Sequence, residues 1–364
     1  MVRAYEGSDT NPTMEKPDMK LLVIAPLSIG VIYGGARMQA IKTSEQLAKL
    51  GVEVNYYNPW ETYEPAAFDI VHIFLAGNET LTLAKKLGDL NCKIAVSPIF
   101  FTRRSAAIIR NSLKLEAVAG KFIRGIFSDY SIKATVCRSA DIILPNTASE
   151  AALIRDGFGI PGQNLSVIPN GVDKRFAEAT PDLFISRHGI QNFTLFVGDC
   201  SARRKNILPL LEQHSPEDKP LVLIGTFDNS SYSESCLEII NSRENVVYLG
   251  PFVQDDPMLA SAYAAADVFT LPSEFETPGI AALEAALAGC RIAITGIGGT
   301  REIFGDYAEY IDPQNKGSYM EAIRRAHEKP DNHTLKDRIL EHYTWEVTGA
   351  QTLKAYKRIL RQSD

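Results

Sequence analysis

The chain has 364 residues, of which 45% are hydrophobic and 23% are charged, and its formal net charge is -6. This length exceeds one ordinary α/β core and predicts about two domains. No apolar run approaches the roughly 20 residues of a membrane-spanning helix, and the acidic balance argues against a general nucleic-acid binder.

The first 18 residues are polar and lack the apolar middle of a signal peptide. We expect a disordered tail over 1–18 and no secretion. Five cysteines are scattered without a C-x-x-C pair, which indicates neither a disulfide framework nor a thiolate metal site. A reduced, cytoplasmic location is the expectation.

From Met19 the chain alternates apolar runs with helical patterns. The run 20–26 ends in a stretch with Pro and Gly, typical of a buried parallel strand. Apolar residues at helical spacing follow over 36–50 and stop at Gly51. Further strands are expected at 52–57, 69–75, 93–97, 141–145 and 165–169. The series predicts a first doubly wound, Rossmann-like domain over 19–172.

Within this domain the charge balance reverses between 101 and 138, where eight Lys or Arg residues face two acids, Glu116 and Asp129. The cations alternate with apolar side chains, which is the composition of a basic amphipathic surface. One interpretation is a solvated helix face, and the other is a peripheral contact with an anionic partner or membrane. The residues concerned include Arg103, Arg104, Arg110, Lys114, Lys121, Arg124, Ile108, Phe122, Ile126 and Phe127.

A second series of strands is expected at 193–198, 221–225, 246–249, 268–271 and 291–295. It predicts a second Rossmann-like domain over 173–344, with the linker near 170–181. Residues 345–360 carry apolar side chains at spacings of three and four, so a terminal helix with one apolar stripe is expected within 345–364.

Two nucleotide motifs can be set aside. Residues 296–301 nearly spell a dinucleotide fingerprint, but Arg301 stands where the last glycine belongs, and the preceding strand is late in its domain. No G-x-x-x-x-G-K-[ST] run occurs, so a P-loop enzyme is excluded.

The informative stretch is 264–300, where a strand, a short loop and an apolar helix follow one another. Proline near a helix start is pre-organised, and glycine lets a ligand approach the backbone. The amides of Gly279 and Ile280, with the helix dipole, would form an anion site suited to a diphosphate.

Glu276 in this loop and Glu284 in this helix are eight residues apart. Carboxylates accept paired hydroxyl hydrogen bonds, so one can hold a sugar ring and the other a ribose. In the alternative interpretation, Glu276 is a capping acid and Glu284 a solvated helix residue. Glu284, however, lies within AALEAALAG, where a lone charge in a core helix requires a partner.

At these residues the chain resembles the retaining glycosyltransferases of family 4, of the GT-B fold, whose segment reads roughly P-S-x-x-E-x-x-G-x-x-x-x-E-A. The resemblance continues through 167–173 at the domain junction, through Gly34-Gly35 after the first strand, and through the terminal HYTWEVTG. It covers nearly the whole chain from Met19. The matching positions of the segment are Pro272, Ser273, Glu276, Gly279, Glu284 and Ala285, followed by Gly289, Gly298, Gly299 and Glu302.

The resemblance implies two Rossmann-like domains that face a cleft, with the C-terminal helix packed back on the first. It also implies transfer of a sugar from a nucleotide diphosphate donor, with retention and without an essential metal or other cofactor. The donor would lie on Gly34, Gly35, Arg204, Lys205, Glu276, Thr277, Pro278, Gly279, Ile280 and Glu284, with Glu276 and Lys205 as the catalytic pair, Glu276 on sugar hydroxyls and Glu284 on ribose.

Two positions depart from the family. Asp199 stands where many members have Arg, so Arg203 or Arg204 would supply the missing charge, or Lys205 would act with the helix N-terminus alone. The strand 93–97 is followed by Pro98 and not by the His that many members have, while His72 lies in an apolar strand and is expected to be a core residue.

The family resemblance favours a UDP-hexose donor and a polysaccharide or lipid-linked acceptor. Two alternatives stay open: a nucleotide-sugar epimerase or phosphorylase on the same fold, and a catalytically silent subunit that binds a sugar nucleotide.

Overall fold

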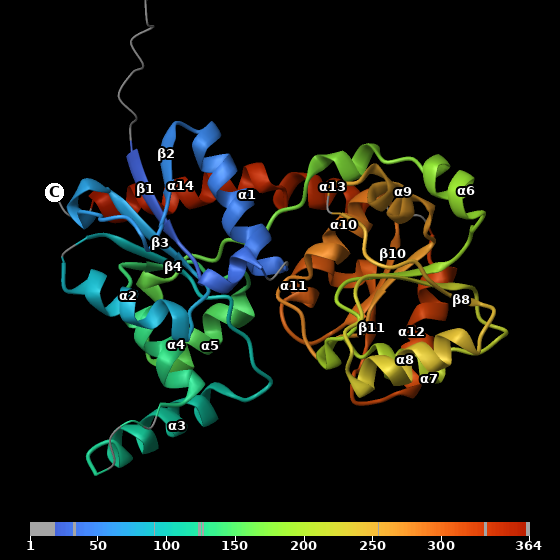
Figure 1. The fold of residues 1–364 in the computed structure, drawn as a ribbon, viewed down its shortest axis with the longest axis horizontal. Coiled ribbons are helices and arrows are strands. Elements are labelled where there is room, and N and C mark those ends of the chain that lie inside the picture. The colour runs from blue at the N-terminus through green and yellow to red at the C-terminus, as the bar shows by residue number, and fades with distance from the viewer. Residues whose placement is uncertain are drawn as a thin grey trace, which may run out of the picture.

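The computed structural model describes residues 19–31, 34–90, 92–122, 125, 127–253, 255–330 and 333–361. These residues form two lobes, each built on a parallel sheet (Figure 1). The expectation for the tail 1–18 lies outside the described residues.

The sheet of the first lobe has five strands in the order β2-β1-β3-β4-β5, and every recorded pairing is parallel. The prediction of a strand at 165–169 is wrong. Leu165 makes an isolated bridge to Ile143, and the chain then continues to the second lobe. The strands are β1 Met19–Ile24, β2 Val52–Tyr56, β3 Ile70–Phe74, β4 Ile94–Ser97 and β5 Ile142–Ile143.

Alternate residues of these strands enter two separate cores. Leu22, Val71 and Val96 pack toward α2, α3, α4 and α5, whereas Leu21 and Ile70 pack toward α1 and the C-terminal helix α14. Serine and threonine side chains cap α3, α4 and α5. The helices are α1 Gly35–Lys49, α2 Asn78–Gly88, α3 Ala106–Ala119, α4 Asp129–Arg138, α5 Ala148–Phe158 and α14 Trp345–Arg361.

The second sheet has six strands in the order β11-β10-β9-β6-β7-β8. Five were expected; β11 was missed because its sequence, AEYI, is short and half-buried at the sheet edge. The strands are β6 Thr194–Val197, β7 Leu221–Ile224, β8 Val246–Tyr248, β9 Val268–Leu271, β10 Arg291–Thr295 and β11 Ala308–Ile311.

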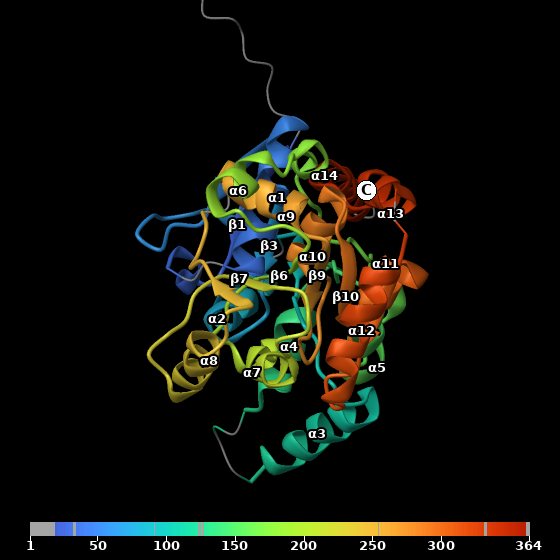
Figure 2. The same ribbon diagram turned by 90° about the vertical axis from the view of Figure 1, so that its right-hand side faces the viewer.

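Helices cover both faces of this sheet (Figure 2). They are α6 Asp182–His188, α7 Ile207–Gln213, α8 Ser231–Asn241, α9 Pro257–Ala265, α10 Ile280–Ala288, α11 Thr300–Phe304, α12 Gly317–Glu328 and α13 His333–His342. Short 3-10 turns are η1 Leu27–Gly30, η2 Pro65–Ala67, η3 Gly162–Asn164, η4 Lys174–Glu178, η5 Arg203–Lys205 and η6 Gly305–Tyr307.

The chain passes between the lobes twice, and the two passages touch. Val172 N–H donates to Tyr343 O at 2.8 Å, and Trp345 N–H donates to Val172 O at 3.3 Å. Gly171 is required here, because a Cβ would lie 2.2 Å from the Trp345 nitrogen. From this crossing α14 runs back along α1, as Figure 1 shows in red. The expected architecture of two doubly wound sheets and a returning helix is confirmed.

The order of the strands locates where ligands bind. In open parallel sheets, ligands occupy the crevice outside the carboxyl ends of the strands, at the point where the strand order reverses. This point lies between β1 and β3 in the first lobe and between β6 and β9 in the second. Gly34 and Gly35 follow β1, while Lys205 and Glu276 follow β6 and β9.

Candidate functional site

The loops after β6 and β9 are tied together by backbone groups. Glu274 N–H donates to Arg204 O at 2.7 Å. Asn206, in the left-handed conformation with φ 55°, begins α7 and donates its side-chain amide to Pro272 O at 2.9 Å. These contacts hold Lys205 beside Glu276.

Lys205 and Glu276 form a largely buried ion pair at this point. The Lys205 Nζ lies 2.6 Å from Glu276 Oε1, and Arg204 Nη1 lies 3.6 Å from the same oxygen. Burial opposes ionisation of Glu276, which is 7% exposed, but the charges of Lys205 and Arg204 outweigh it and lower the pKa of the carboxyl. Glu276 is therefore a carboxylate at neutral pH.

A second loop fixes the backbone of Glu276. Glu276 N–H donates to Ile297 O at 3.1 Å, and Gly299 N–H donates to Glu276 O at 2.9 Å. Gly298 has φ +103°, and a Cβ there would lie 2.1 Å from Glu276 O. The backbone geometry thus explains why the motif has glycine at 298.

The N-terminus of α10 lies next to Glu276. Its N-cap is Gly279, in the left-handed conformation with φ 83°, and no side chain caps it. Pro278 precedes this cap and does not lie in the first turn, where prolines are favoured. Across the cleft, a Cβ on Gly35 would lie 3.9 Å from the Ile280 side chain. The glycine loop after β1 therefore lies beside the Ile280 side chain at the start of α10, with Gly34 as the N-cap of α1.

Glu284 lies one turn further along α10 and is 5% exposed. The interpretation of Glu284 as a solvated residue is wrong. Its Oε2 accepts a hydrogen bond from the Tyr263 hydroxyl at 2.9 Å, which gives the buried carboxylate the partner it needs. Tyr263 is itself fully buried.

The charged residues of the loop after β6 have different partners. Asp199 is exposed, and its Oδ1 accepts from the Ser201 amide at 3.0 Å and the Ser201 hydroxyl at 2.6 Å. The Arg203 guanidinium lies 5.3 Å from the centroid of the Tyr232 ring. Arg204, and not Arg203, therefore approaches Glu276.

His72 is a core residue, as expected. Its Nδ1 lies 2.6 Å from the Tyr356 hydroxyl and its Nε2 lies 2.9 Å from the Ser97 hydroxyl. Burial lowers the pKa of its imidazole to about 3, so the ring is neutral. It joins β3 to α14 and does not face the cleft loops.

Several features of the loops after β3, β4 and β9 were not predicted from the sequence. Leu75 and Ile99, which follow β3 and β4, have φ values of 66° and 52°, a conformation that such side chains rarely adopt. The rings of Phe101 and Phe275 lie 5.2 Å apart and join the two lobes next to Glu276. No composition or spacing signal predicts either feature.

Glu150 connects the loops of the first lobe beneath the cleft. It is fully buried, and its oxygens accept from the Phe100 amide at 2.6 Å and the Asn146 amide at 2.8 Å. Asn146 in turn accepts from the Gln39 side chain at 2.9 Å. Burial outweighs the two amide bonds and raises the pKa of Glu150 to about 7.

Glu302, at the start of α11, reaches across to the first lobe. Its carboxylate accepts from the Ala148 amide at 2.7 Å and the Ser149 amide at 2.8 Å, at the N-terminus of α5. Beside it, a Cβ on Gly299 would lie 2.1 Å from a carbon of Thr147. The motif residues Gly299 and Glu302 therefore form a contact between the lobes.

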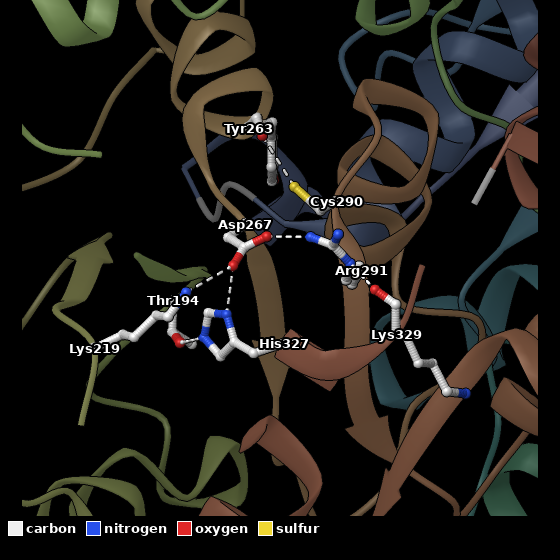
Figure 3. Close-up of polar contacts among 8 residues, drawn as sticks. All are labelled: Thr194, Lys219, Tyr263, Asp267, Cys290, Arg291, His327 and Lys329. Carbon is white, nitrogen blue, oxygen red and sulfur yellow. Dashed lines mark hydrogen bonds and ion pairs between the residues drawn. The ribbon is translucent and has the colours of Figure 1, made fainter. Parts of the chain in front are cut away.

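A second charged cluster lies at the opposite, amino end of the second sheet (Figure 3). Asp267 bonds His327 Nδ1 at 2.6 Å and Lys219 Nζ at 3.3 Å, and it is also paired with Arg291. The His327 Nε2 lies 3.0 Å from the Thr194 hydroxyl. The cluster joins the starts of β6, β9 and β10 to α12 and is remote from Glu276 in the sheet.

Among the described residues, no three His, Cys, Asp or Glu side chains are grouped so as to hold a metal ion. In the same part of the chain, no helix is long and apolar enough to cross a membrane.

Residues 191–329 match the family model described as glycosyl transferases group 1. An uncharacterised glycosyltransferase of Methanocaldococcus jannaschii is 29% identical over 222 residues, which are 55% of this chain and 55% of that protein. The match thus spans about half the length of that relative.

The fold resembles that of sucrose-phosphate synthase from Thermosynechococcus elongatus, with a TM-score of 0.74, 16% identity, and coverage of 94% of this chain and 100% of the other. It also resembles HepE of Anabaena in complex with UDP and glucose, with a TM-score of 0.67, 15% identity, and coverage of 93% and 100%. Residues 191–329 are therefore similar to the group 1 glycosyltransferases, and the described residues have the GT-B fold.

Proposed function

We propose that this chain transfers a hexose from a nucleotide diphosphate donor to an acceptor hydroxyl, with retention at the anomeric carbon. The carrying observation is the buried pair of Lys205 and Glu276, 2.6 Å apart, at the point where the strand order of the second sheet reverses. The uncapped N-terminus of α10 adjoins Glu276, and the loop of Gly35 adjoins the Ile280 side chain.

The donor would bind with its diphosphate between these groups. Amides at a helix N-terminus and the helix dipole favour an anion, so Gly279 and Ile280 would receive the phosphates. Gly34 and Gly35 would allow close backbone approach from the other lobe, and Thr277 and Pro278 complete the loop that lies against the donor.

The carboxylates would then divide between two sugars. Glu276, held ionised by Lys205 and Arg204, would accept hydrogen bonds from hydroxyls of the transferred hexose. Glu284, oriented by the Tyr263 hydroxyl, would accept from the ribose.

Negative charge builds on the leaving diphosphate as the glycosidic bond breaks. Pre-organised positive groups in a water-poor site stabilise such charge without reorganisation. Lys205, Arg204 and the N-terminus of α10 would supply this stabilisation. The acceptor hydroxyl would attack from the face that the leaving group vacates, which gives retention.

A UDP-hexose donor is supported by the likeness to HepE, which was solved with UDP and glucose. For the acceptor we propose a saccharide or a lipid-linked saccharide, bound on the side of the first lobe. A panel of nucleotide diphosphate sugars tested by thermal shift would identify the donor, since a ligand at about 100 times its dissociation constant adds roughly 2.7 kcal/mol.

Two variants test the division of roles. Glu284→Gln should weaken free UDP and UDP-hexose alike, because its contact is to ribose, whereas Glu276→Gln should weaken the UDP-hexose alone. Calorimetric titration with both ligands measures these affinities. Tyr263→Phe is a matched variant that should weaken the binding of both ligands, but less than Glu284→Gln does. Equal losses of free UDP in both variants would contradict the assignment, and wild-type protein without any donor turnover would indicate a binding subunit instead.

A further inference from the structure

Helix α3 stands at the far end of the first lobe, away from the second lobe in Figure 1, and it is the lowest helix in Figure 2. It attaches to α5 and α4 through one side, where Ile109 is buried against Gly157. Backbone bonds continue the turn past its end, from Lys121 N–H to Val118 O and from Phe122 N–H to Ala119 O.

The outward side of α3 carries an apolar stripe. Ile108, Leu115, Val118 and Phe122 follow one another at spacings of seven, three and four, which places them on one face of a helix. Their exposed fractions are 48%, 72%, 56% and 84%, and nearby Phe127 is 66% exposed. These large apolar side chains therefore face water together.

A row of cations lies beside this apolar stripe. Arg110, Lys114 and Lys121 are all exposed, and their spacings of four and seven put them on one neighbouring face of α3. With Arg138 and Phe127 they line a cavity of about 670 Å³ between α3 and α4. The one acid in this lining, Glu116, already accepts from the Ser128 amide at 3.1 Å and the Ser128 hydroxyl at 2.5 Å.

We propose that α3 docks this protein on an anionic lipid bilayer. The apolar stripe would enter the boundary between headgroups and acyl chains, and the cation row would contact the lipid phosphates, as amphipathic surface helices do. Charge favours this occupant over a neutral or basic protein groove, because cations flank the apolar stripe in a chain whose net charge is -6. Arg124 and Ile126, which belong to the same basic segment, lie outside the described residues and are not needed.

The test is co-sedimentation with vesicles of phosphatidylglycerol and phosphatidylcholine, with pure phosphatidylcholine as the reference. Wild-type protein should sediment with the anionic vesicles at about 25 mM salt and be released at about 300 mM, where screening is stronger. Lys114→Glu with Lys121→Glu should lower the partition coefficient at least about tenfold. Leu115→Glu with Phe122→Glu should lower it as much without removing a cation.

Two controls separate the site from general effects. Lys49→Glu with Lys354→Glu changes the net charge equally at exposed positions on other helices and should leave binding unchanged. Val253→Glu, at an apolar side chain that is 74% exposed in the second lobe, should also leave it unchanged. Thermal unfolding confirms that each variant is folded, whether or not the protein turns over a donor.

Four sedimentation results would each overturn the proposal. The first two are wild-type protein that stays in the supernatant at low salt, and wild-type protein that binds pure phosphatidylcholine as well as it binds the anionic vesicles. The third is a Leu115→Glu, Phe122→Glu variant that binds like wild type. The fourth is a Lys49→Glu, Lys354→Glu variant whose partition coefficient falls as far as those of the α3 variants. A concentration-dependent dimer that the Leu115→Glu, Phe122→Glu variant dissociates would equally overturn it and assign the apolar stripe to contact between copies.

Discussion

The ion pair of Lys205 and Glu276 has a consequence for how mutations at either residue behave. Breaking a buried pair leaves an uncompensated charge, at a cost of about 3–5 kcal/mol. Removing Lys205 would leave Glu276 with Arg204, 3.6 Å away and partly exposed, as its nearest recorded cation. A Lys205 variant therefore perturbs the carboxylate as well as the diphosphate site.

We expect Lys205→Met to lower kcat about 10²- to 10³-fold, more than it raises KM, because charge on the diphosphate grows in the transition state. The variant should also raise the pKa of Glu276, so activity should fall at a higher pH on the acidic side than in wild type. Steady-state kinetics over pH 4–8 measure both effects. A raised KM at unchanged kcat and an unshifted profile would refute this role.

Glu150 should give the first lobe a pH-dependent stability. Its pKa rises from 4.5 to about 7 on folding, so its contribution is fully present below pH 4.5 and is lost as the pH rises through 7. The change amounts to roughly 3 kcal/mol. Glu150→Gln should abolish this dependence of the unfolding free energy on pH. At low pH it should also lower the unfolding free energy by about 1–3 kcal/mol, because the NH₂ of the glutamine would face an amide donor.

Urea unfolding at several pH values measures the Glu150 effect. Glu79 is a suitable comparison, because its carboxyl is exposed on α2 and bonds the Ser28 hydroxyl at 2.7 Å. Glu79→Gln should keep the wild-type fall in unfolding free energy between pH 4.5 and 7. An identical slope in wild type and Glu150→Gln would show that another group titrates.

The sequence pointed to candidate site residues but could not give their contacts. Glu276, Glu284 and Lys205 stand in a recognisable segment, whereas the bond from Tyr263 to Glu284 depends on how α9 packs on α10. Glu150 does have a local signal: Thr147 and Glu150 form the S/T-x-x-E pattern of a capping box. Its side chain bonds Phe100 and Asn146, and these tertiary partners could not be read from the pattern.

At the scale of elements, long runs with clear periodicity were predicted well. The strands β1 to β4 and β6 to β10, and the helices α1, α10 and α14, follow from apolar runs and stop signals. The segment 165–169 failed because its apolar residues pack beside β5 while its backbone makes one isolated bridge. A short apolar run does not by itself specify how far a backbone ladder extends.

The contact of Glu302 with the N-terminus of α5 joins the two lobes. A carboxylate at a helix N-terminus is favoured by both the amides and the dipole, by about 0.5–2 kcal/mol. Glu302→Ala should therefore accelerate hydrogen exchange at the amides of Ala148 and Ser149 about 2- to 30-fold. Glu328→Ala, at an exposed acid of α12, is the matched control. Unchanged exchange in Glu302→Ala would mean that the contact is not populated in solution.

At the scale of the molecule, the sequence established two α/β domains and a final helix, and the family resemblance suggested its return to the first lobe. What it could not establish is how the lobes meet, because the contacts of Phe101 with Phe275 and of Thr147 with Gly299 join positions more than 150 residues apart. Such contacts leave no local periodicity. They also join the two lobes beside the proposed donor site.

Helix α14 should govern the stability of the first lobe. Tyr356 is fully buried in the same core as β1 and β3, and its hydroxyl bonds His72 at 2.6 Å. Tyr356→Ala should cost about 3–5 kcal/mol through the cavity that it leaves. Tyr356→Phe should cost about 1–3 kcal/mol, because it leaves His72 without this partner.

Guanidinium unfolding, followed by Trp fluorescence and by hydrogen exchange of each lobe, measures the effect of these variants. The first lobe should lose protection earlier than the second in Tyr356→Ala. Simultaneous loss in both lobes, with an unchanged midpoint, would show that α14 does not limit the stability of the first lobe.

The crossing at Val172 and Trp345 has a further meaning during synthesis. The sheet of the first lobe is synthesised before the second lobe, but α14, which covers one of its faces, is synthesised only after the whole second lobe. At about 5–20 residues per second, the intervening chain takes roughly 10–40 s to appear. Throughout that interval, the nascent first lobe would expose the apolar surface that Ala355, Tyr356 and Ile359 later cover, and exposed apolar surface of this kind favours aggregation and chaperone binding.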